Sequence, residues 1–290
     1  MGNFLLEQIV NGVVAGSVYA LIAAGMTMIF GVLRAINFAH GEYYMIGTFA
    51  AWYVISKLGI DYGASIVIAV AVSALIAALI GRLVMQRLVN APFQSGVLAT
   101  LGISLVLQNA VILAFGGGYK VFPGGWLDPV ELFGIGMAQQ RVVLVVASLV
   151  MFAGLEWMVR RTRMGKSIRA VSQNPECCQV IGIDVEKVVR QTFILGTALA
   201  AFSGALTGPV NVSVYGGMGE TITLKTFAVI VMGGMGNVRG TLFAGWMLGI
   251  AESLVAGSIG LEYRDSVGFI ALLLMLMFRP MGLFAPKARF

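Results

Sequence analysis

Four long runs without a charged residue limit what this chain can fold into. They are Gln8–Leu33, Tyr62–Gly81, Leu88–Tyr119 and Gln191–Gly219. A helix needs about 20 consecutive apolar residues to cross the hydrocarbon core of a bilayer, and each run is long enough. The strands of a membrane β-barrel alternate apolar and polar residues over about 10 positions, and these runs do not alternate. The sequence therefore predicts an all-α, polytopic helical membrane protein.

Few charged residues are available to cover a soluble surface. Only 11% of the 290 residues are charged, against roughly 25% in soluble domains. The 38 glycines fall mainly inside the apolar runs, where glycine lets transmembrane helices approach closely. We predict a single transmembrane domain, residues 1–290, with eight or nine crossings and some broken or re-entrant helices. The number depends on whether Thr226–Val238 crosses the membrane or re-enters it.

Charges beside the first apolar segment predict the orientation of the chain. Glu7 precedes the segment Ile9–Phe30, and Arg34 follows it. Since positively charged residues stay on the cytoplasmic side, the N-terminus is expected outside. The glycine- and proline-rich segment Gly116–Gln140 is then the main outer loop, and the basic segment 160–190 is cytoplasmic. Positive cytoplasmic loops account for the net charge of +6, so no nucleic-acid partner is implied.

The segment 160–190 is the only long polar run in the chain. Within it, Met164-Gly165-Lys166-Ser167 resembles the end of a phosphate-binding P-loop, but Arg160 stands where that motif requires glycine. The chain therefore has no ATPase motif, and we do not expect an enzyme. Cys177 and Cys178 are adjacent and make a poor disulfide, and no histidine or further cysteine lies near enough in sequence to complete a metal site.

A shorter part of this segment resembles the coupling motif of ABC-importer permeases. In that motif a glutamate and two small residues precede a glycine, as Glu176-Cys177-Cys178 precedes Gly182 here, with cysteine in place of the usual alanine. In the family this short helix docks in a cleft of the ATPase subunit. Ser172 or Asn174 is placed to cap such a helix. The predicted ATPase-coupling residues are Asn174, Pro175, Glu176, Cys177, Cys178, Gly182, Ile183 and Asp184.

Two longer segments carry the same resemblance. Asn11–Gly47 is very similar to the N-terminal signature of LivH-type branched-chain amino-acid permeases, and Lys225–Glu252 is similar to their second, glycine-rich signature. The resemblance extends through Arg163–Gly204 and covers nearly the whole chain. It implies a multi-pass permease subunit of an ATP-driven ABC importer in the inner membrane. Such a subunit translocates branched-chain amino acids by alternating access.

The resemblance also implies partners. A second, related permease subunit, two ATP-binding subunits and a soluble substrate-binding protein would complete the transporter, with membrane lipid around it. No cofactor, metal or catalytic residue is expected in this chain. Related permeases carry urea or short amides, and the signatures do not separate that cargo from amino acids. A membrane enzyme or proton-coupled transporter is a further alternative, but the chain offers one histidine, His40, and few intramembrane acids.

Two interruptions of the apolar pattern are candidates for helix breaks. In the first, His40 serves structural hydrogen bonding or a proton relay, and Asn37 and Glu42 are expected to satisfy freed backbone groups. The second, Gly233–Gly240, is a close-packing element, part of a substrate path, or both, because transporters build sites from discontinuous helices. Glu252 lies in an apolar stretch, and the sequence does not identify its partner. The candidate path or break residues are Asn37, His40, Gly41, Glu42, Gly233, Gly234 and Gly236.

Overall fold

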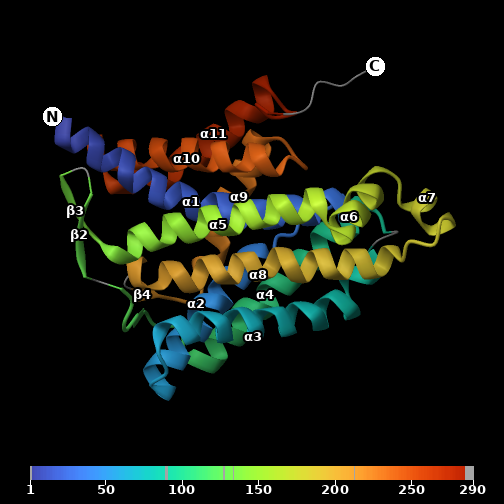
Figure 1. Ribbon diagram of the computed structural model, residues 1–290, viewed down its shortest axis with the longest axis horizontal. Coiled ribbons are helices and arrows are strands. Elements are labelled where there is room, and N and C mark those ends of the chain that lie inside the picture. Colours follow the sequence, from blue (N-terminus) through green and yellow to red (C-terminus); the bar gives the residue numbers. More distant parts are fainter. Residues whose placement is uncertain (1, 89–90, 127, 133, 212, 285–290) are drawn as a thin grey trace.

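The uncharged runs of the sequence form long helices that pack side by side (Figure 1). The computed structural model describes residues 2–88, 91–126, 128–132, 134–211 and 213–284. Its helices are α1 Gly2–Leu33, α2 His40–Leu58, α3 Tyr62–Leu83, α4 Phe93–Phe115, α5 Gln139–Arg161, α6 Arg163–Gln173, α7 Pro175–Val180, α8 Val185–Asn211, α9 Met218–Gly233, α10 Val238–Ser258 and α11 Arg264–Phe278, with 3-10 turns at Met85–Leu88 and Leu261–Tyr263.

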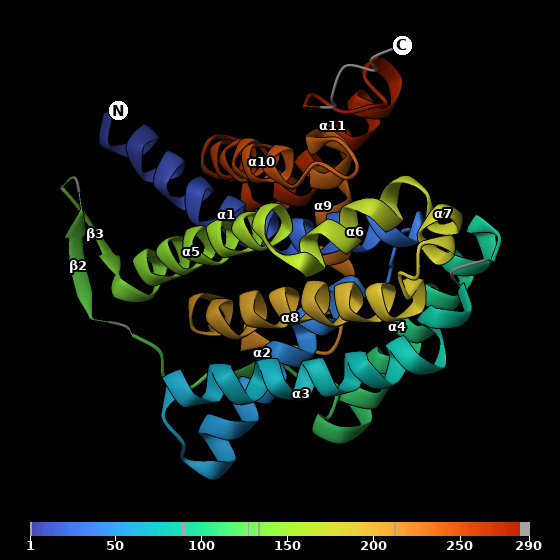
Figure 2. The same ribbon diagram turned by 45° about the vertical axis from the view of Figure 1, so that its right-hand side comes forward.

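Six of the described helices are long and apolar enough to cross a membrane: α1, α3, α4, α5, α8 and α10. This confirms the predicted polytopic helical membrane fold. The helices α2, α9 and α11 are shorter or more polar. α2 packs against α3 and α8, α9 packs against α1, α2 and α10, and α11 lies at the edge of the bundle against α9 and α10 (Figure 2). Figure 2 shows the order of the layers: α10 packs on α1, α1 packs on α8, and α3 lies on the far side of α8.

Buried and exposed helices differ sharply in this bundle. Most residues in the apolar stretches of α1 and α8 are buried, whereas most residues in the apolar stretches of α3, α4 and α5 are not. The outward side chains of these three helices are nevertheless large and apolar, as at Leu75, Leu113 and Val150. An apolar outer face suits lipid or a second membrane subunit, as the sequence predicted.

Glycines bring α1 and α10 into backbone contact. A Cβ atom added to Gly16 would lie 2.6 Å from the carbonyl oxygen of Gly245, and one added to Gly12 would lie 2.8 Å from the amide nitrogen of Ile250. Gly249 meets Gly16 from the α10 side. Such small-residue contacts drive helix association in membranes, because lipid supplies no hydrophobic force between helices.

The glycine- and proline-rich outer segment contains one short strand pair and a further strand that pairs outside the segment. β1 (Lys120–Val121) pairs antiparallel with β4 (Ser213–Val214), and β2 (Pro129–Leu132) pairs antiparallel with β3 (Ile135–Ala138). The sequence argued against a regular helix in Gly116–Gln140, and α5 indeed begins only at its end. The strand pairs themselves were not predicted.

Positive charges collect at one end of the bundle. Figure 1 shows α6 and α7 at this end, opposite the N-terminus and the β2–β3 hairpin. Because cationic residues stay on the cytoplasmic side, this distribution assigns the α6–α7 end to the cytoplasm and the N-terminus to the outside. The described cations at the α6–α7 end are Arg34, Arg82, Arg87, Arg160, Arg161, Arg163, Lys166, Arg169, Lys187, Arg190, Arg239 and Arg279, against Lys57, Lys120, Arg141 and Arg264 at the other end.

One added methyl group should distinguish close-packed from open glycines on the same helix. Gly16→Ala should destabilise the protein by about 1 to 3 kcal/mol, because its Cβ would overlap the α10 backbone. Gly31→Ala, also on α1, meets nothing within 4 Å, and should be neutral or stabilising by up to about 1 kcal/mol. Thermal unfolding in detergent compares the two. Equal melting temperatures would show that the α1–α10 contact does not depend on glycine.

Candidate functional site

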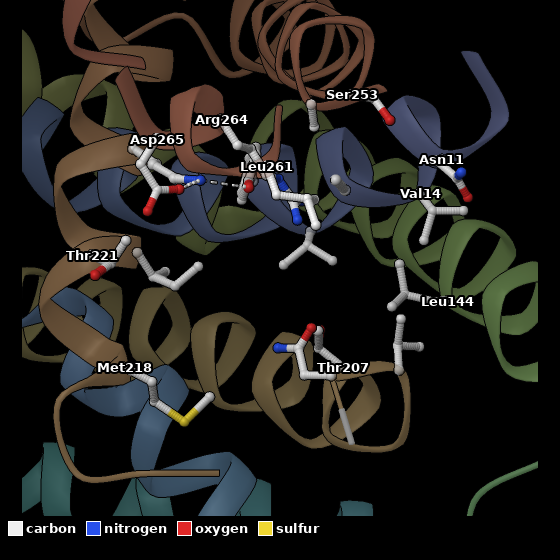
Figure 3. Close-up of a pocket in the computed structure, with 18 of the residues that line it drawn as sticks. Asn11, Val14, Leu144, Thr207, Met218, Thr221, Ser253, Leu261, Arg264 and Asp265 are labelled. Carbon is white, nitrogen blue, oxygen red and sulfur yellow. Dashed lines mark hydrogen bonds and ion pairs between the residues drawn. The ribbon is translucent and has the colours of Figure 1, made fainter. Parts of the chain in front are cut away.

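A cavity of about 780 Å³ opens at the outer end of the bundle. Its wall is built from the N-terminal parts of α1, α5, α9 and α11 and the C-terminal parts of α8 and α10. Figure 3 shows side chains from several of these helices converging on the open space. Helix ends that are distant in sequence therefore form one concave site, which is typical of transporters.

Four polar side chains form a hydrogen-bonded cluster at the cavity wall. Lys225 Nζ on α9 lies 3.0 Å from Glu252 Oε2 on α10 and 2.7 Å from Asp265 Oδ1 on α11. Tyr19 on α1 donates its hydroxyl to Glu252 Oε2 at 2.8 Å and accepts from Lys225 at 3.2 Å. Glu252 is fully buried, and burying a charge is costly unless it is paired. The cluster thus identifies the partners of Glu252, which the sequence alone did not.

The wall also carries a neutral phenol beside these charges. Tyr215 follows β4 and lines the cavity. Burial raises the pKa of the Tyr215 hydroxyl above its usual value, and nearby Tyr119 and Asp265 raise it further. The hydroxyl therefore stays protonated, and it can donate a hydrogen bond at neutral pH.

The predicted coupling residues lie together at the cytoplasmic end. Asn174 caps α7, because its Oδ1 accepts a hydrogen bond from Cys177 N at 3.0 Å, which selects Asn174 over Ser172 as the cap. Asp184 Oδ1 accepts from Lys187 N at 2.9 Å at the start of α8. Gly182 between these helices has φ +82°, a conformation that favours glycine. Asn174, Gly182 and Asp184 therefore have defined roles in shaping the loop.

One face of this loop is anchored and the other is exposed. Cys178 is buried in an apolar cluster with Val32 of α1 and Val188 of α8, and Ile183 packs against that cluster. Glu176 and Cys177 are exposed, Pro175 is partly buried, and both thiols are free. Cys178 therefore anchors the loop to the ends of α1 and α8, while Glu176 and Cys177 remain accessible.

Arg34 ties the loop to the end of α1. Its Nη2 donates to the carbonyl oxygens of Ser172 and Gln173 at 3.3 and 3.1 Å, at the C-terminus of α6. Arg34 also has φ +52°, the only positive φ among the described non-glycine residues. A cation at a helix C-terminus is favourable, and this contact offsets the backbone strain.

The first predicted break lies between α1 and α2, inside the bundle. His40 Nε2 lies 3.1 Å from the carbonyl oxygen of Ile22, about two-thirds of the way along α1, and His40 is fully buried, so α2 begins within the protein interior. Asn37 Oδ1 accepts from Ala39 N at 3.2 Å, and Gly41 N donates to Thr223 at 3.0 Å. Protein groups thus accept the hydrogen bonds of backbone amides at the break, which lipid could not do.

Glu42 does not serve that purpose. Its Oε1 accepts a hydrogen bond from the Ser104 hydroxyl at 2.9 Å, and no described backbone amide donates to it. The expectation that Glu42 satisfies the freed backbone was therefore wrong. The reason is that the freed amides of Phe38, Ala39 and Gly41 already donate to Thr100, Asn37 and Thr223.

The second predicted break separates α9 from α10. Gly234 and Gly236 have φ +88° and +86°, and a Cβ on Gly233 would lie 2.8 Å from the carbonyl carbon of Gly240. These glycines form a tight turn at the cytoplasmic end. None of the seven predicted path or break residues is among the residues that line the outer cavity.

Comparison with known proteins identifies the family. The family described as the permease component of a branched-chain amino acid transport system matches residues 8–278. The high-affinity branched-chain amino acid permease BraD of Pseudomonas aeruginosa is 33% identical over 291 residues, 96% of this chain and 95% of that protein. LivH of Escherichia coli, of the same description, is 33% identical over 293 residues, 97% and 95% of the two chains. The ribose import permease RbsC of Escherichia coli is 27% identical over 262 residues, which cover 86% of this chain and 78% of RbsC.

The chain belongs to the branched-chain amino-acid permease family. It is a multi-pass protein of the inner membrane. Several residues at the cavity of this permease were missed from the sequence. Lys225 is the one cation between Gln191 and Val238, and this isolated charge could have marked it as a site residue. No feature of the sequence distinguished Tyr19 in this way. Arg264 and Asp265 are consecutive charges between two apolar segments, and such charges are common in loops.

Removing one member of the buried cluster should be more damaging than removing two. Lys225→Met leaves the Glu252 carboxylate buried without its nearest cation, and should destabilise the permease by about 3 to 5 kcal/mol. The double variant Lys225→Met/Glu252→Gln should recover much of this loss. Thermal unfolding of the four proteins of the cycle, including Glu252→Gln, measures the coupling. Additive effects would contradict a direct interaction between the two side chains.

Proposed function

We propose that this permease translocates branched-chain amino acids across the inner membrane as a subunit of an ATP-driven importer. A second, related permease, two ATP-binding subunits and a soluble binding protein complete the assembly. The observation that carries the proposal is the apolar C-terminal end of α7, at the cationic end of the bundle. Val180, the last residue of α7, is 87% exposed, and Ile181, which follows it, is 72% exposed. Large apolar side chains exposed outside the lipid region indicate a protein interface. An ATP-binding subunit is the partner that the family supplies there.

Packed side chains connect the C-terminal end of α7 to the membrane-spanning helices. Cys178 lies in one apolar cluster with the cytoplasmic ends of α1 and α8. Arg34 holds the C-terminus of α6 to the end of α1. A movement of α7 imposed by nucleotide binding would therefore displace α1 and α8. Nucleotide shifts the transport equilibrium only if the α7 contacts differ between its states.

The conformation fits one state of alternating access. The outer cavity is open, while α1 and α8 touch farther toward the cytoplasm, where a Cβ on Gly196 would lie 2.7 Å from the Gly25 carbonyl oxygen. Gly47 and Ala201 bring α2 and α8 equally close. These backbone contacts close the path inward, so transport requires them to separate.

Reconstitution tests the function directly. The complete complex in proteoliposomes, with binding protein outside and ATP inside, should accumulate radiolabelled L-leucine, and excess L-valine but not urea should compete. Uptake that persists without ATP and follows a proton gradient would overturn the proposal. Competition by urea instead of L-valine would show that an importer of the same architecture carries urea or short amides.

Charge reversal at Glu176 should uncouple ATP hydrolysis from uptake. Glu176 is exposed in the first turn of α7, where a negative charge is favourable at the helix N-terminus by about 0.3 to 1 kcal/mol. Glu176→Arg should keep the complex assembled and reduce uptake per ATP hydrolysed. Glu186→Arg, an exposed acid in the first turn of α8, is the matched control. Wild-type uptake by an assembled Glu176→Arg complex would refute the role of α7 in coupling.

A branched residue at Gly182 should distort the exit from α7. With φ +82°, any side chain there is strained by about 1 to 2 kcal/mol, although no atom lies within 4 Å of its Cβ position. Gly182→Val should therefore impair uptake per ATP hydrolysed. Gly118→Val, at an outer glycine with open space and without positive φ, should not. Equal uptake by both variants would show that the conformation of Gly182 is irrelevant to coupling.

A further inference from the structure

Two adjacent residues of opposite charge begin α11 at the outer cavity. Figure 3 shows Arg264 and Asp265 together on its wall. The side chain of Arg264 is 42% exposed, and its closest carboxylate contact is Glu252 Oε2, 3.5 Å from Nε. Arg264 Nε has no hydrogen-bond partner among the described residues. Asp265 is 60% exposed and contacts Lys225 through Oδ1 only.

Lys225 is fully engaged, in contrast to Arg264. Its ammonium group has three N–H donors, which face Glu252, Asp265 and Tyr19. A ligand could reach Lys225 only by displacing one of these partners. The Arg264 side chain is partly exposed at the cavity, with its buried Nε facing Glu252, and its planar guanidinium has the geometry that binds a carboxylate through two parallel hydrogen bonds.

The remaining wall offers apolar contacts at a distance from these charges. Figure 3 shows Val14 and Leu144 on the side of the cavity away from Asp265. Val18, Val210 and Ile222 also line the space. A ligand with charged groups at one end and an aliphatic group at the other would match this division.

We propose that the outer cavity contains a binding site for the zwitterionic group of an aliphatic α-amino acid. Arg264 binds the carboxylate, Asp265 accepts hydrogen bonds from the ammonium group, and the aliphatic chain lies toward Val14 and Leu144. This site rests on the proposed function and specifies how the membrane subunit recognises its cargo.

Charge balance favours a zwitterion over other ligands. Two cations, Lys225 and Arg264, face two carboxylates, Glu252 and Asp265. A ligand without net charge keeps this cluster neutral, whereas an anion or a cation leaves one charge unbalanced beside the fully buried Glu252. Urea is also neutral, but it has neither a carboxylate for Arg264 nor an ammonium group for Asp265.

Ligand analogues test the site without any substitution. The purified complex, without binding protein, is titrated with radiolabelled L-leucine in competition with isocaproate, which lacks the ammonium group, and isoamylamine, which lacks the carboxylate. Each analogue should compete about tenfold or more weakly than unlabelled L-leucine, because each loses hydrogen bonds between charged groups. Competition by either analogue as strong as that of L-leucine, or no saturable L-leucine binding, would overturn the site.

Substitutions test the assigned residues during transport. In proteoliposomes with binding protein and ATP, Arg264→Gln and Asp265→Asn should raise the KM for L-leucine about tenfold, and Arg264→Lys should partly restore it. Lys57→Gln is the matched control, because Lys57 is a cation at the same end of the bundle but does not line the cavity. Its KM should change by about twofold at most.

The outcomes separate the two proposals. Normal uptake by the wild-type complex with an unchanged KM in Arg264→Gln overturns the zwitterion site and leaves the transport function intact. A wild-type complex that does not take up L-leucine with ATP overturns the transport function, and the site with it.

Discussion

The absence of water in the bilayer core is the constraint on which this structure depends. Every backbone amide and carbonyl there must find a partner within the protein. Continuous helices meet this requirement, and α1 does so over 32 residues. Where the chain leaves helical geometry between α1 and α2, Asn37 within the break and Thr100 and Thr223 on other helices supply the missing partners. The irregular backbone of this break is therefore surrounded by several helices.

The absence of water also bears on the buried charges of Lys225 and Glu252. Lys225 and Glu252 would each be very unfavourable alone in a nonpolar region, and replacing such a pair by apolar residues is often neutral or stabilising. Stability therefore gives little reason to keep them. Their position on the wall of an open cavity, beside Arg264 and Asp265, gives a functional reason.

The sequence predicted features that depend on local pattern. Hydrophobic runs located the long helices, and cap chemistry located α7 with Asn174 at its start. The two interruptions of the apolar pattern are both breaks in the structure. The β1–β4 pair was not predicted, because its two strands lie about ninety residues apart in the sequence.

The charged cluster shows why the rest was not predicted. Glu252 meets Lys225, 27 positions earlier, and Tyr19, 233 positions earlier. Pairings of this kind are set by the way helices pack, and no local periodicity encodes them. Asp265 and Arg264 follow a turn, where charged residues usually face water, so nothing in their neighbourhood distinguished them.

One helix connects the two functional ends of the molecule. Tyr19 on α1 belongs to the charged cluster, and Arg34 at its end holds the coupling loop. The 15 positions between them span about 22 Å of helix. Coupling over such distances can be carried by a rigid element with two arrangements. Since Gly12 and Gly16 fix α10 to α1 by backbone contact, a displacement of Arg34 would move Tyr19 and Glu252 together. The cavity charges would then shift relative to α11, which carries Arg264 and Asp265.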